Sequence, residues 1–302
     1  MHGVTTFALG ETPLLSRTVV ERAEELRSDV DALRVGWVTA KLLRIDRRGQ
    51  APVDGSVLVL ADATELGPEP VSGAVFLGIR DGLHVWAVRV LAQTGTVADL
   101  RRVGEDLGDA DADLMVSAVA LLNWHDQAAF SAVDGSPSEP TVAGWSRIST
   151  VTGHEEFPRT DPAIICLVHD GGDRVLLARQ PTWPERRFSV LAGFVEAGES
   201  LEACVVREIR EEVGVDVHDV QYLGSQPWPF PRSLMLGFSA VADPEQNVEF
   251  LDGEISEAQW FTREEVRAAL EVGDWASSEE APLLLPGSIS IARGLIIGWV
   301  NG

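Results

Sequence analysis

Cysteine is scarce in this sequence of 302 residues, which contains only Cys166 and Cys204. Both lie in apolar, periodic segments, so we interpret them as small buried residues and exclude a disulfide framework. The N-terminal stretch MHGVTTFALGETPLL lacks a basic segment followed by an apolar core, so we expect no signal peptide. No apolar run approaches the length of a membrane span. These absences favour a cytoplasmic protein that has no membrane partner.

Basic residues are also few, because 24 lysines and arginines face 47 aspartates and glutamates, which gives a net charge of −23. Such a chain has no general attraction for a nucleic acid backbone. A small anionic substrate can still bind where metal ions neutralise the local field. The acidity also keeps a protein soluble, or reflects a source whose proteins are acidic overall. Composition leaves these explanations open.

The length suits two domains, and the hydrophobic content of 45% excludes a disordered chain. We expect an α/β (α+β) protein with a smaller N-terminal α/β domain over residues 1–129 and a second domain over 159–302. Residues 130–158 are rich in Ser, Gly, Pro, Thr and Asp, which predicts an irregular connector. Periodicity predicts helices over 19–33, 114–124, 200–213, 262–270 and 289–300. It predicts strands over 57–60, 74–79, 83–88, 164–168, 175–178, 188–191, 220–223, 234–241 and 259–261.

The most informative stretch is GFVEAGESLEACVVREIREEVGV, from Gly193 to Val215. Ser200 is suited to cap the start of a helix, and Gly214 is suited to the left-handed turn that ends one. Between them, Glu208, Glu211 and Glu212 are three or four residues apart, so their carboxylates share one face.

Carboxylates crowded on one face repel one another and destabilise an isolated helix. A hard cation such as Mg²⁺ or Mn²⁺ would reverse this effect, because it prefers carboxylate oxygens and keeps positions free for phosphate oxygens. The alternative is a solvated acidic helix in an acidic protein. That alternative explains the glutamates but not the glycines and the arginine at fixed offsets.

A second stretch, SQPWPFPRS from Ser225 to Ser233, contains three prolines in nine residues. These prolines exclude a helix or a central strand and predict a stiff loop. Such a loop holds Trp228 and Phe230 in fixed directions, which favours stacking on flat heteroaromatic rings. The alternative is a loop whose aromatic rings close one edge of the core.

The first stretch resembles the signature of the Nudix hydrolases, and every specified position is filled. The second, read as SQPWPFPxS, resembles the hallmark of the NADH pyrophosphatase family within them. The resemblance covers residues 157–302 and implies a C-terminal α/β/α sandwich. It also implies hydrolysis of the pyrophosphate of NADH or NAD⁺ to nicotinamide mononucleotide and AMP. The implied cofactor is Mg²⁺ or Mn²⁺, and the implied assembly is a homodimer.

The resemblance also implies roles for individual residues. The implied metal site comprises the backbone carbonyl of Ala192 and the side chains of Glu208, Glu211, Glu212 and Glu254. The implied catalytic group is Glu208, Glu211, Glu212 and Arg207. The implied substrate contacts are Arg101, Phe157, Phe194, Gln226, Pro227, Trp228, Pro229, Phe230, Pro231, Arg232, Ser233, Glu254 and Ala292. We expect Glu211 to be the general base, and we expect Arg207 to orient the glutamates. Glu199 is either the partner of Arg207 or an outer-shell ligand of the metal.

The sequence departs from the family at the connector, where many members bind zinc through four cysteines. The equivalent positions hold Ser131, Asp134, Ser149 and Thr152, so no four-thiolate site forms and we expect no zinc. His125 and His154 lie near these positions, and we interpret them as solvated loop residues. Packing alone is then expected to hold the connector in place.

Two other activities stay open. The same site could remove an NAD cap from RNA 5′ ends, or it could act more broadly on ADP-ribose and similar diphosphates. A protein of a different class, a nucleotide sensor built on an inactive Nudix fold, is disfavoured by the complete set of glutamates.

Overall fold

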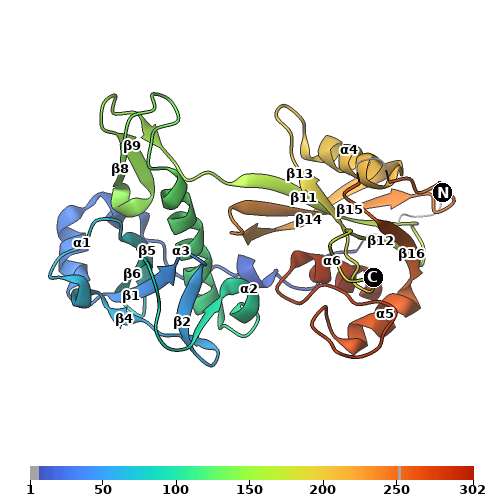
Figure 1. Cartoon of the computed structure of the whole chain (residues 1–302), viewed down its shortest axis with the longest axis horizontal. Coiled ribbons are helices and arrows are strands. Elements are labelled where there is room, and N and C mark those ends of the chain that lie inside the picture. The colour runs from blue at the N-terminus through green and yellow to red at the C-terminus, as the bar shows by residue number, and fades with distance from the viewer. Residues whose placement is uncertain (1–6, 251–252) are drawn as a thin grey trace. The chain divides into compact units, whose positions relative to one another are not determined.

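The computed structural model describes residues 7–250 and 253–302, which form two compact units (Figure 1). The C-terminal unit contains the residues up to Ser16, Asp161–Gln226 and Ser233–Gly302. The N-terminal unit contains Arg17–Thr160 and Pro227–Arg232. The short segment Pro227–Arg232 therefore belongs to the N-terminal unit, although the residues on both sides of it belong to the other.

A six-stranded mixed sheet forms the centre of the C-terminal unit. Its order is β14-β15-β11-β12-β16, and β13 pairs with β11. Strands β11 and β15 are parallel, whereas β11 pairs antiparallel with β12 and β13. The strands span Asp161–His169 (β11), Arg174–Arg179 (β12), Leu191–Phe194 (β13), Val217–Trp228 (β14), Ser233–Ala242 (β15) and Glu257–Thr262 (β16).

Helices cover both faces of this sheet because successive residues of a strand point to opposite sides. Ile165 and Leu167 of β11 pack in a core with α5 (Arg263–Val272) and α6 (Ile291–Asn301). Their neighbours Ile164 and Cys166 pack in a second core with α4 (Leu201–Val213). Figure 1 shows α4 on one side of the sheet and α5 and α6 on the other. The expected α/β/α sandwich is confirmed.

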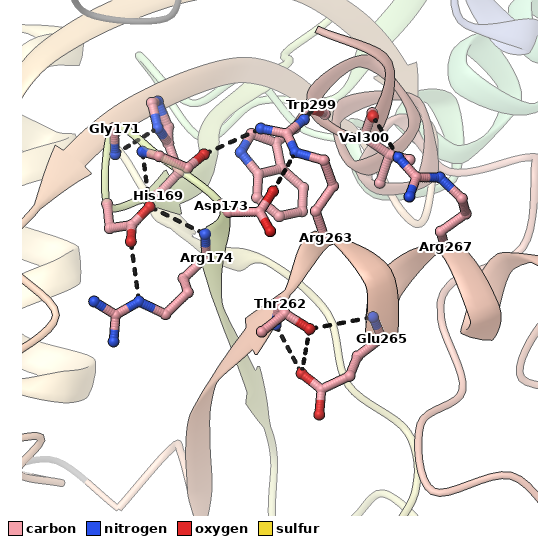
Figure 2. Close-up of polar contacts among 12 residues, drawn as sticks. His169, Gly171, Asp173, Arg174, Thr262, Arg263, Glu265, Arg267, Trp299 and Val300 are labelled. Carbon is pink, nitrogen blue, oxygen red and sulfur yellow. Dashed lines mark hydrogen bonds and ion pairs between the residues drawn. The ribbon is translucent and has the colours of Figure 1, made fainter.

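Arg263 joins three segments of the C-terminal unit (Figure 2). Its guanidinium donates to Asp173 Oδ1 at 2.9 Å and to the carbonyls of Gly172 and Trp299, and it lies 4.3 Å from the centre of the Trp299 ring. Arg267 donates to the carbonyl of Val300 at 3.4 Å. These arginines satisfy carbonyls that the last turn of α6 leaves without helical partners. They therefore fix the end of α6 to the start of α5.

The N-terminal unit is built on a four-stranded sheet of order β4-β1-β6-β5, in which β1 and β6 are parallel. A smaller sheet has the order β3-β2-β7. Helix α3 packs against β1, β5 and β6. The elements span Val30–Trp37 (α1), Lys41–Asp46 (β1), Gln50–Asp54 (β2), Val57–Leu58 (β3), Ala61–Asp62 (β4), Val75–Arg80 (β5), Leu83–Val90 (β6), Val97–Asp99 (β7), Leu100–Val103 (α2) and Asp109–Gln127 (α3). Short 3₁₀ turns cover Glu24–Ser28, Ala63–Leu66 and Val142–Gly144 in this unit, and Leu14–Ser16 in the C-terminal unit.

Two aspartates near the start of α3, Asp111 and Asp113, are buried. Asp111 accepts hydrogen bonds from the backbone N–H of Leu58, at 2.9 Å, and from Arg80. Asp113 accepts from the backbone N–H groups of Val19 and Val20, both at 3.0 Å. Burial of a carboxylate is tolerated when such donors replace water. These aspartates therefore attach flanking segments to α3.

The connector is an ordered sheet, so the prediction of an irregular segment over 130–158 was wrong. Strands β8 (Ser138–Thr141), β9 (Ser146–Ser149) and β10 (Glu155–Glu156) pair in the order β10-β9-β8. The alternation of apolar and polar residues could not be recognised in the sequence, because the strands are only two to four residues long and are rich in Ser, Thr and Pro.

Hydrogen bonds at the positions of the missing cysteines hold this sheet, so the expectation that packing alone would do so was also wrong. Asp134 accepts from the backbone N–H of Ser136 at 2.8 Å, from Ser149 Oγ at 2.7 Å and from Thr152 Oγ1. Ser131 donates instead to Glu156, at 3.0 Å. The hydrogen bonds to Asp134, first among them that of the Ser136 hydroxyl, hold the pKa of that carboxyl well below its usual range.

The interpretation of His125 as a solvated loop residue was wrong too, because His125 lies in α3. Its Nε2 donates to the carbonyl of Gly144 at 2.8 Å, and its Nδ1 accepts from Arg147 at 3.0 Å. Burial lowers the pKa of His125, which favours this neutral tautomer.

Three other element predictions were wrong in part. The expected buried strand over 57–60 shortens to Val57–Leu58, and Val57 is 54% exposed. The single helix expected over 19–33 is divided into Glu24–Ser28 and Val30–Trp37. The strand expected over 188–191 begins at Leu191. A hairpin turn at Asp81-Gly82 joins β5 to β6, and both residues adopt positive φ as this turn requires.

Candidate functional site

Helix α4 positions the acidic residues. The Ser200 side chain caps its start by accepting from the N–H of Ala203 at 3.2 Å, and Gly214 ends it with a φ of 71°. One face of the helix, which includes Cys204 and Ile209, is buried in the core. Glu208 and Glu212 lie beside this buried face, and Glu212 is only 3% exposed. The helix therefore holds two carboxylates close to the sheet, which costs free energy unless a cation or hydrogen bonds compensate.

Arg207 links the glutamates of this helix to the loop that precedes it. Its guanidinium donates two hydrogen bonds to Glu199, at 2.6 and 3.1 Å, so the expected pairing is present. It also donates to Glu208 at 3.0 Å and to Glu211 at 2.8 Å. A fifth bond reaches the carbonyl of Phe194 at 3.0 Å. The planar fork of arginine thus fixes three carboxylates and the end of β13 at once.

These contacts change the proton affinities of the group. The hydrogen bonds from Arg207 lower the pKa of Glu199 to about 2. Burial raises the pKa of Glu208, an effect that the Arg207 hydrogen bond opposes and that the charges of Glu211 and Glu254 reinforce. Glu254 therefore lies within electrostatic reach of Glu208, although it is more than forty positions away in the sequence.

Gly193 makes room for the Glu208 carboxylate. A Cβ atom on Gly193 would be 1.9 Å from Glu208 Cδ and 2.2 Å from both carboxylate oxygens. Only glycine permits such an approach of a side chain to the backbone. Strand β13, which also carries Ala192, is thus in direct contact with the acidic face of α4. The fixed glycine of the sequence signature has this steric cause.

The chemistry of this group fits a divalent cation, because Glu208, Glu211, Glu212 and Glu254 supply only hard oxygen donors. Across residues 7–250 and 253–302, no group of three or more His, Cys, Asp or Glu side chains is arranged as a finished metal site. The carboxylates of Glu208 and Glu211 face Arg207 instead. The cradle at Gly193 and the raised pKa of Glu208 both fit a bound cation, which would relieve the repulsion among these carboxylates.

The proline-rich stretch starts as an edge strand and not as a loop. Strand β14 continues to Trp228 at the end of the sheet order, where proline is tolerated. Gln226 is fully buried, and its side chain donates to the carbonyl of Ile289 and accepts from the N–H of Ile291 at 2.8 Å. Its amide is therefore engaged by the start of α6, whereas we expected it to contact substrate.

Pro229–Arg232 form the loop itself, and Asn123 of α3 holds it. Asn123 Nδ2 donates to the carbonyls of Pro229 and Pro231, at 3.2 and 3.1 Å. Its Oδ1 accepts from Arg89 at 2.9 Å. Sequence reasoning missed Asn123, for which the one signal was a lone amide in the apolar run LMVSAVALLNW.

The loop brings the two expected aromatic rings together with Arg101. The rings of Trp228 and Phe230 meet edge to face with centroids 4.9 Å apart. The Arg101 guanidinium lies 4.1 Å from the centre of the Phe230 ring and 5.3 Å from that of Trp228. Cation–π contacts thus join Arg101 to the loop.

The remaining residues that we expected to contact the substrate differ in exposure and in position. Phe157 is 68% exposed and Phe194 is 60% exposed, so both rings are available to a ligand. Ala292 is 1% exposed and packs in the core of the C-terminal unit. Ser233 is the first residue of β15. Arg232 donates to Gln127 of α3 at 2.9 Å.

Comparison with known proteins gives two matches to family models. A NUDIX domain matches residues 159–281. An NADH pyrophosphatase-like rudimentary NUDIX domain matches residues 41–124. A crystal structure of a NUDIX hydrolase from Nitrosomonas europaea covers 45% of this chain and 78% of its own, with 18% sequence identity and a TM-score of 0.38.

Two curated relatives are similar over most of the chain. The NAD-capped RNA hydrolase NudC of Mycobacterium bovis is 58% identical over 301 residues, which cover 97% of this chain and 96% of the relative. The mitochondrial NAD(P)H pyrophosphatase NUDT13 of Mus musculus is 41% identical over 212 residues, which cover 68% of this chain and 60% of the relative. No helix in the described ranges is long and apolar enough to cross a membrane. With a complete signature from Gly193 to Val215, a proline-rich aromatic loop and likeness along almost its whole length, the chain belongs to the NADH pyrophosphatase family of the Nudix hydrolases.

Proposed function

We propose that the protein hydrolyses the pyrophosphate of NADH or NAD⁺ to nicotinamide mononucleotide and AMP, with Mg²⁺ or Mn²⁺ as cofactor. The observation that supports this most is the arrangement of Arg207 and Gly193 around Glu208, which holds acidic side chains of α4 beside β13. Such a group would hold a cation, which a hydrolase of an anionic diphosphate needs because the carboxylates alone would repel the substrate.

Glu208, Glu211, Glu212 and Glu254 would hold the cation together with the carbonyl of Ala192. The cation would screen the charge of the phosphates and polarise the P–O bond that breaks. Glu211 is our choice for the general base that takes a proton from the attacking water. Arg207 keeps the carboxylates oriented and does not touch the substrate. Attack in line at phosphorus then needs positioning more than a covalent intermediate.

Trp228 and Phe230 would stack on the flat rings of the dinucleotide, with Arg101 beside them. We assign Gln226 a supporting role, since its amide already holds α6. Phe157, Phe194, Arg232, Ser233 and Ala292 stay proposed substrate contacts. The homodimer and the cytoplasmic location also stay predictions from the sequence.

The proposal is tested by incubating the protein with NADH and Mg²⁺ and identifying the products by chromatography. We expect AMP and reduced nicotinamide mononucleotide in equal amounts, and no products with excess chelator. Glu212→Gln should slow this reaction at least about 100-fold, since it removes a carboxylate that would face the cation, while its thermal unfolding shows an intact fold. Equal turnover of ADP-ribose and NADH would favour a broader diphosphatase. Absence of AMP after hours with every metal would favour a nucleotide sensor.

Removal of an NAD cap from RNA is a second candidate function, because it breaks the same bond. The observation that favours it is the name of the Mycobacterium bovis relative, NAD-capped RNA hydrolase, at 58% identity over nearly both chains. The test compares kcat/KM for NADH and for a short NAD-capped RNA under one set of conditions. A capped RNA that is cleaved at least as efficiently as NADH would support this function, and an uncleaved one would refute it.

A further inference from the structure

A cavity of about 400 Å³ lies within the N-terminal unit beside the proline-rich loop. The turn between β1 and β2 contributes Arg47 and Arg48 to its lining, and α2 contributes Arg101. Pro229–Pro231 form another part of the wall. The cavity and every residue that lines it therefore belong to one compact unit.

Positive charge is in excess in this cavity, although the chain carries a net charge of −23. Asp126 and Asp99 are the acidic lining residues. Asp126 is paired with Arg89 at 2.9 Å, and Asp99 accepts the N–H of Arg102 at the start of α2. Within the described ranges, no ion pair joins Arg47 or Arg48 to a carboxylate. Both arginines are exposed, so their guanidinium groups are available to an anion.

Phe230 belongs both to this cavity and to the pair of rings, Trp228 and Phe230, that we propose to stack on the substrate. Its ring meets that of Trp228 edge to face, and it also lines the cavity. A group that extends from a nucleoside stacked on these rings would therefore reach the arginines. Guanidinium groups bind phosphate oxygens with two parallel hydrogen bonds, which makes phosphate the group that this lining suits best.

We propose that this cavity binds a phosphate group attached to the ribose of the dinucleotide, with Arg47 and Arg48 as its main contacts. The inference rests on the proposed function of the adjoining loop and adds a determinant of substrate choice to it. Two substrates carry such a group. NADPH has a 2′-phosphate on its adenosine ribose, and NAD-capped RNA has a 3′-phosphodiester at the same ribose.

The test uses the full-length variant R47Q/R48Q, which removes both charges at an exposed turn. The matched control is R34Q/R102Q, which removes two charges from exposed arginines of the same unit that do not line this cavity. Hydrolysis of NADH, NADPH and an NAD-capped trinucleotide is followed by release of nicotinamide mononucleotide, reduced or oxidised, which all three substrates give as a product. Dissociation constants for the same ligands come from tryptophan fluorescence without divalent metal. Circular dichroism and thermal unfolding verify that both variants are folded.

The readout is the kcat/KM of each phosphate-bearing substrate divided by that of NADH. We expect R47Q/R48Q to lower this ratio about tenfold for NADPH, for the capped RNA or for both, because one contact between charged groups is worth about a factor of ten. Loss with NADPH alone identifies the 2′-phosphate, and loss with the RNA alone identifies the phosphodiester. The inference is overturned if both ratios in R47Q/R48Q equal those of R34Q/R102Q.

Failure of the proposed function would look different. In that case wild-type protein releases no AMP from NADH, while the ligand affinities still report the preference for the added phosphate. A wild-type protein that hydrolyses NADH, with no affinity or rate effect specific to R47Q/R48Q, would refute only the role of the cavity.

Discussion

Gly193→Ala should slow the enzyme about 100-fold without unfolding it. The added methyl group would lie 1.9 Å from Glu208 Cδ, so the Glu208 carboxylate must turn away from β13. The backbone at Gly193 does not adopt a positive φ, so alanine fits the strand itself. The substitution therefore moves one carboxylate and leaves the surrounding backbone in place.

The two consequences differ in size. Losing the hydrogen bond of 3.0 Å between Arg207 and Glu208 costs about 1 kcal/mol. Replacing glycine in a strand returns roughly 0.5–1 kcal/mol. The free energy of unfolding should thus change by less than about 1 kcal/mol. Displacing a group that would hold the cation should slow turnover about 100-fold, which corresponds to about 2.7 kcal/mol of the barrier.

The assay measures AMP release from NADH at saturating Mg²⁺, together with urea unfolding. Gly10→Ala is the matched control, since a Cβ there would meet nothing within 4 Å. The double variant Gly193→Ala/Glu208→Gln should be about as slow as Glu208→Gln alone, because both changes act through one carboxylate. Full activity of Gly193→Ala, or a further 100-fold loss in the double variant, would refute the reasoning.

Two further substitutions test other parts of the account. Trp228→Ala should raise KM for NADH by about tenfold, since stacking on one base is worth about 1–3 kcal/mol; an unchanged KM would contradict the stacking role. Asp134→Asn should lower the unfolding temperature at pH 7, because the pKa of Asp134 is depressed in the folded protein. A carboxylate whose pKa is depressed by folding stabilises the fold at pH values above its unfolded pKa of about 3.9. This stabilisation is lost as the pH falls towards the folded pKa. The difference in melting temperature between wild type and Asp134→Asn should therefore narrow below about pH 4, and a constant difference down to pH 2 would count against it.

Features set by neighbours in the sequence could be predicted. The ends of α4 and the start of α5 follow from residues at each helix itself: the cap at Ser200, the left-handed Gly214, and the capping box of Thr262 with Glu265. The common face of the glutamates on α4 follows from helical spacing alone. The burial of β11 on both faces could be predicted as well, because an uninterrupted apolar run indicates a strand that is covered on both sides.

Features set by distant partners could not be predicted. Asn123 contacts carbonyls more than 100 positions away, and Gln226 binds the start of α6 more than 60 positions away. The hydrogen bonds of Asp134 replace a zinc site with short polar side chains, and their spacing resembles that of any polar loop. The sequence indicated glycine at position 193, but its contact with Glu208 depends on how α4 packs on β13.

The most direct test is a Mn²⁺ titration of the wild-type protein and of Glu208→Gln, followed by electron paramagnetic resonance without substrate. If α4 gathers its carboxylates to hold a cation, the wild type binds Mn²⁺ and Glu208→Gln binds it at least about tenfold more weakly. Equal Mn²⁺ affinity of the two proteins would contradict the account.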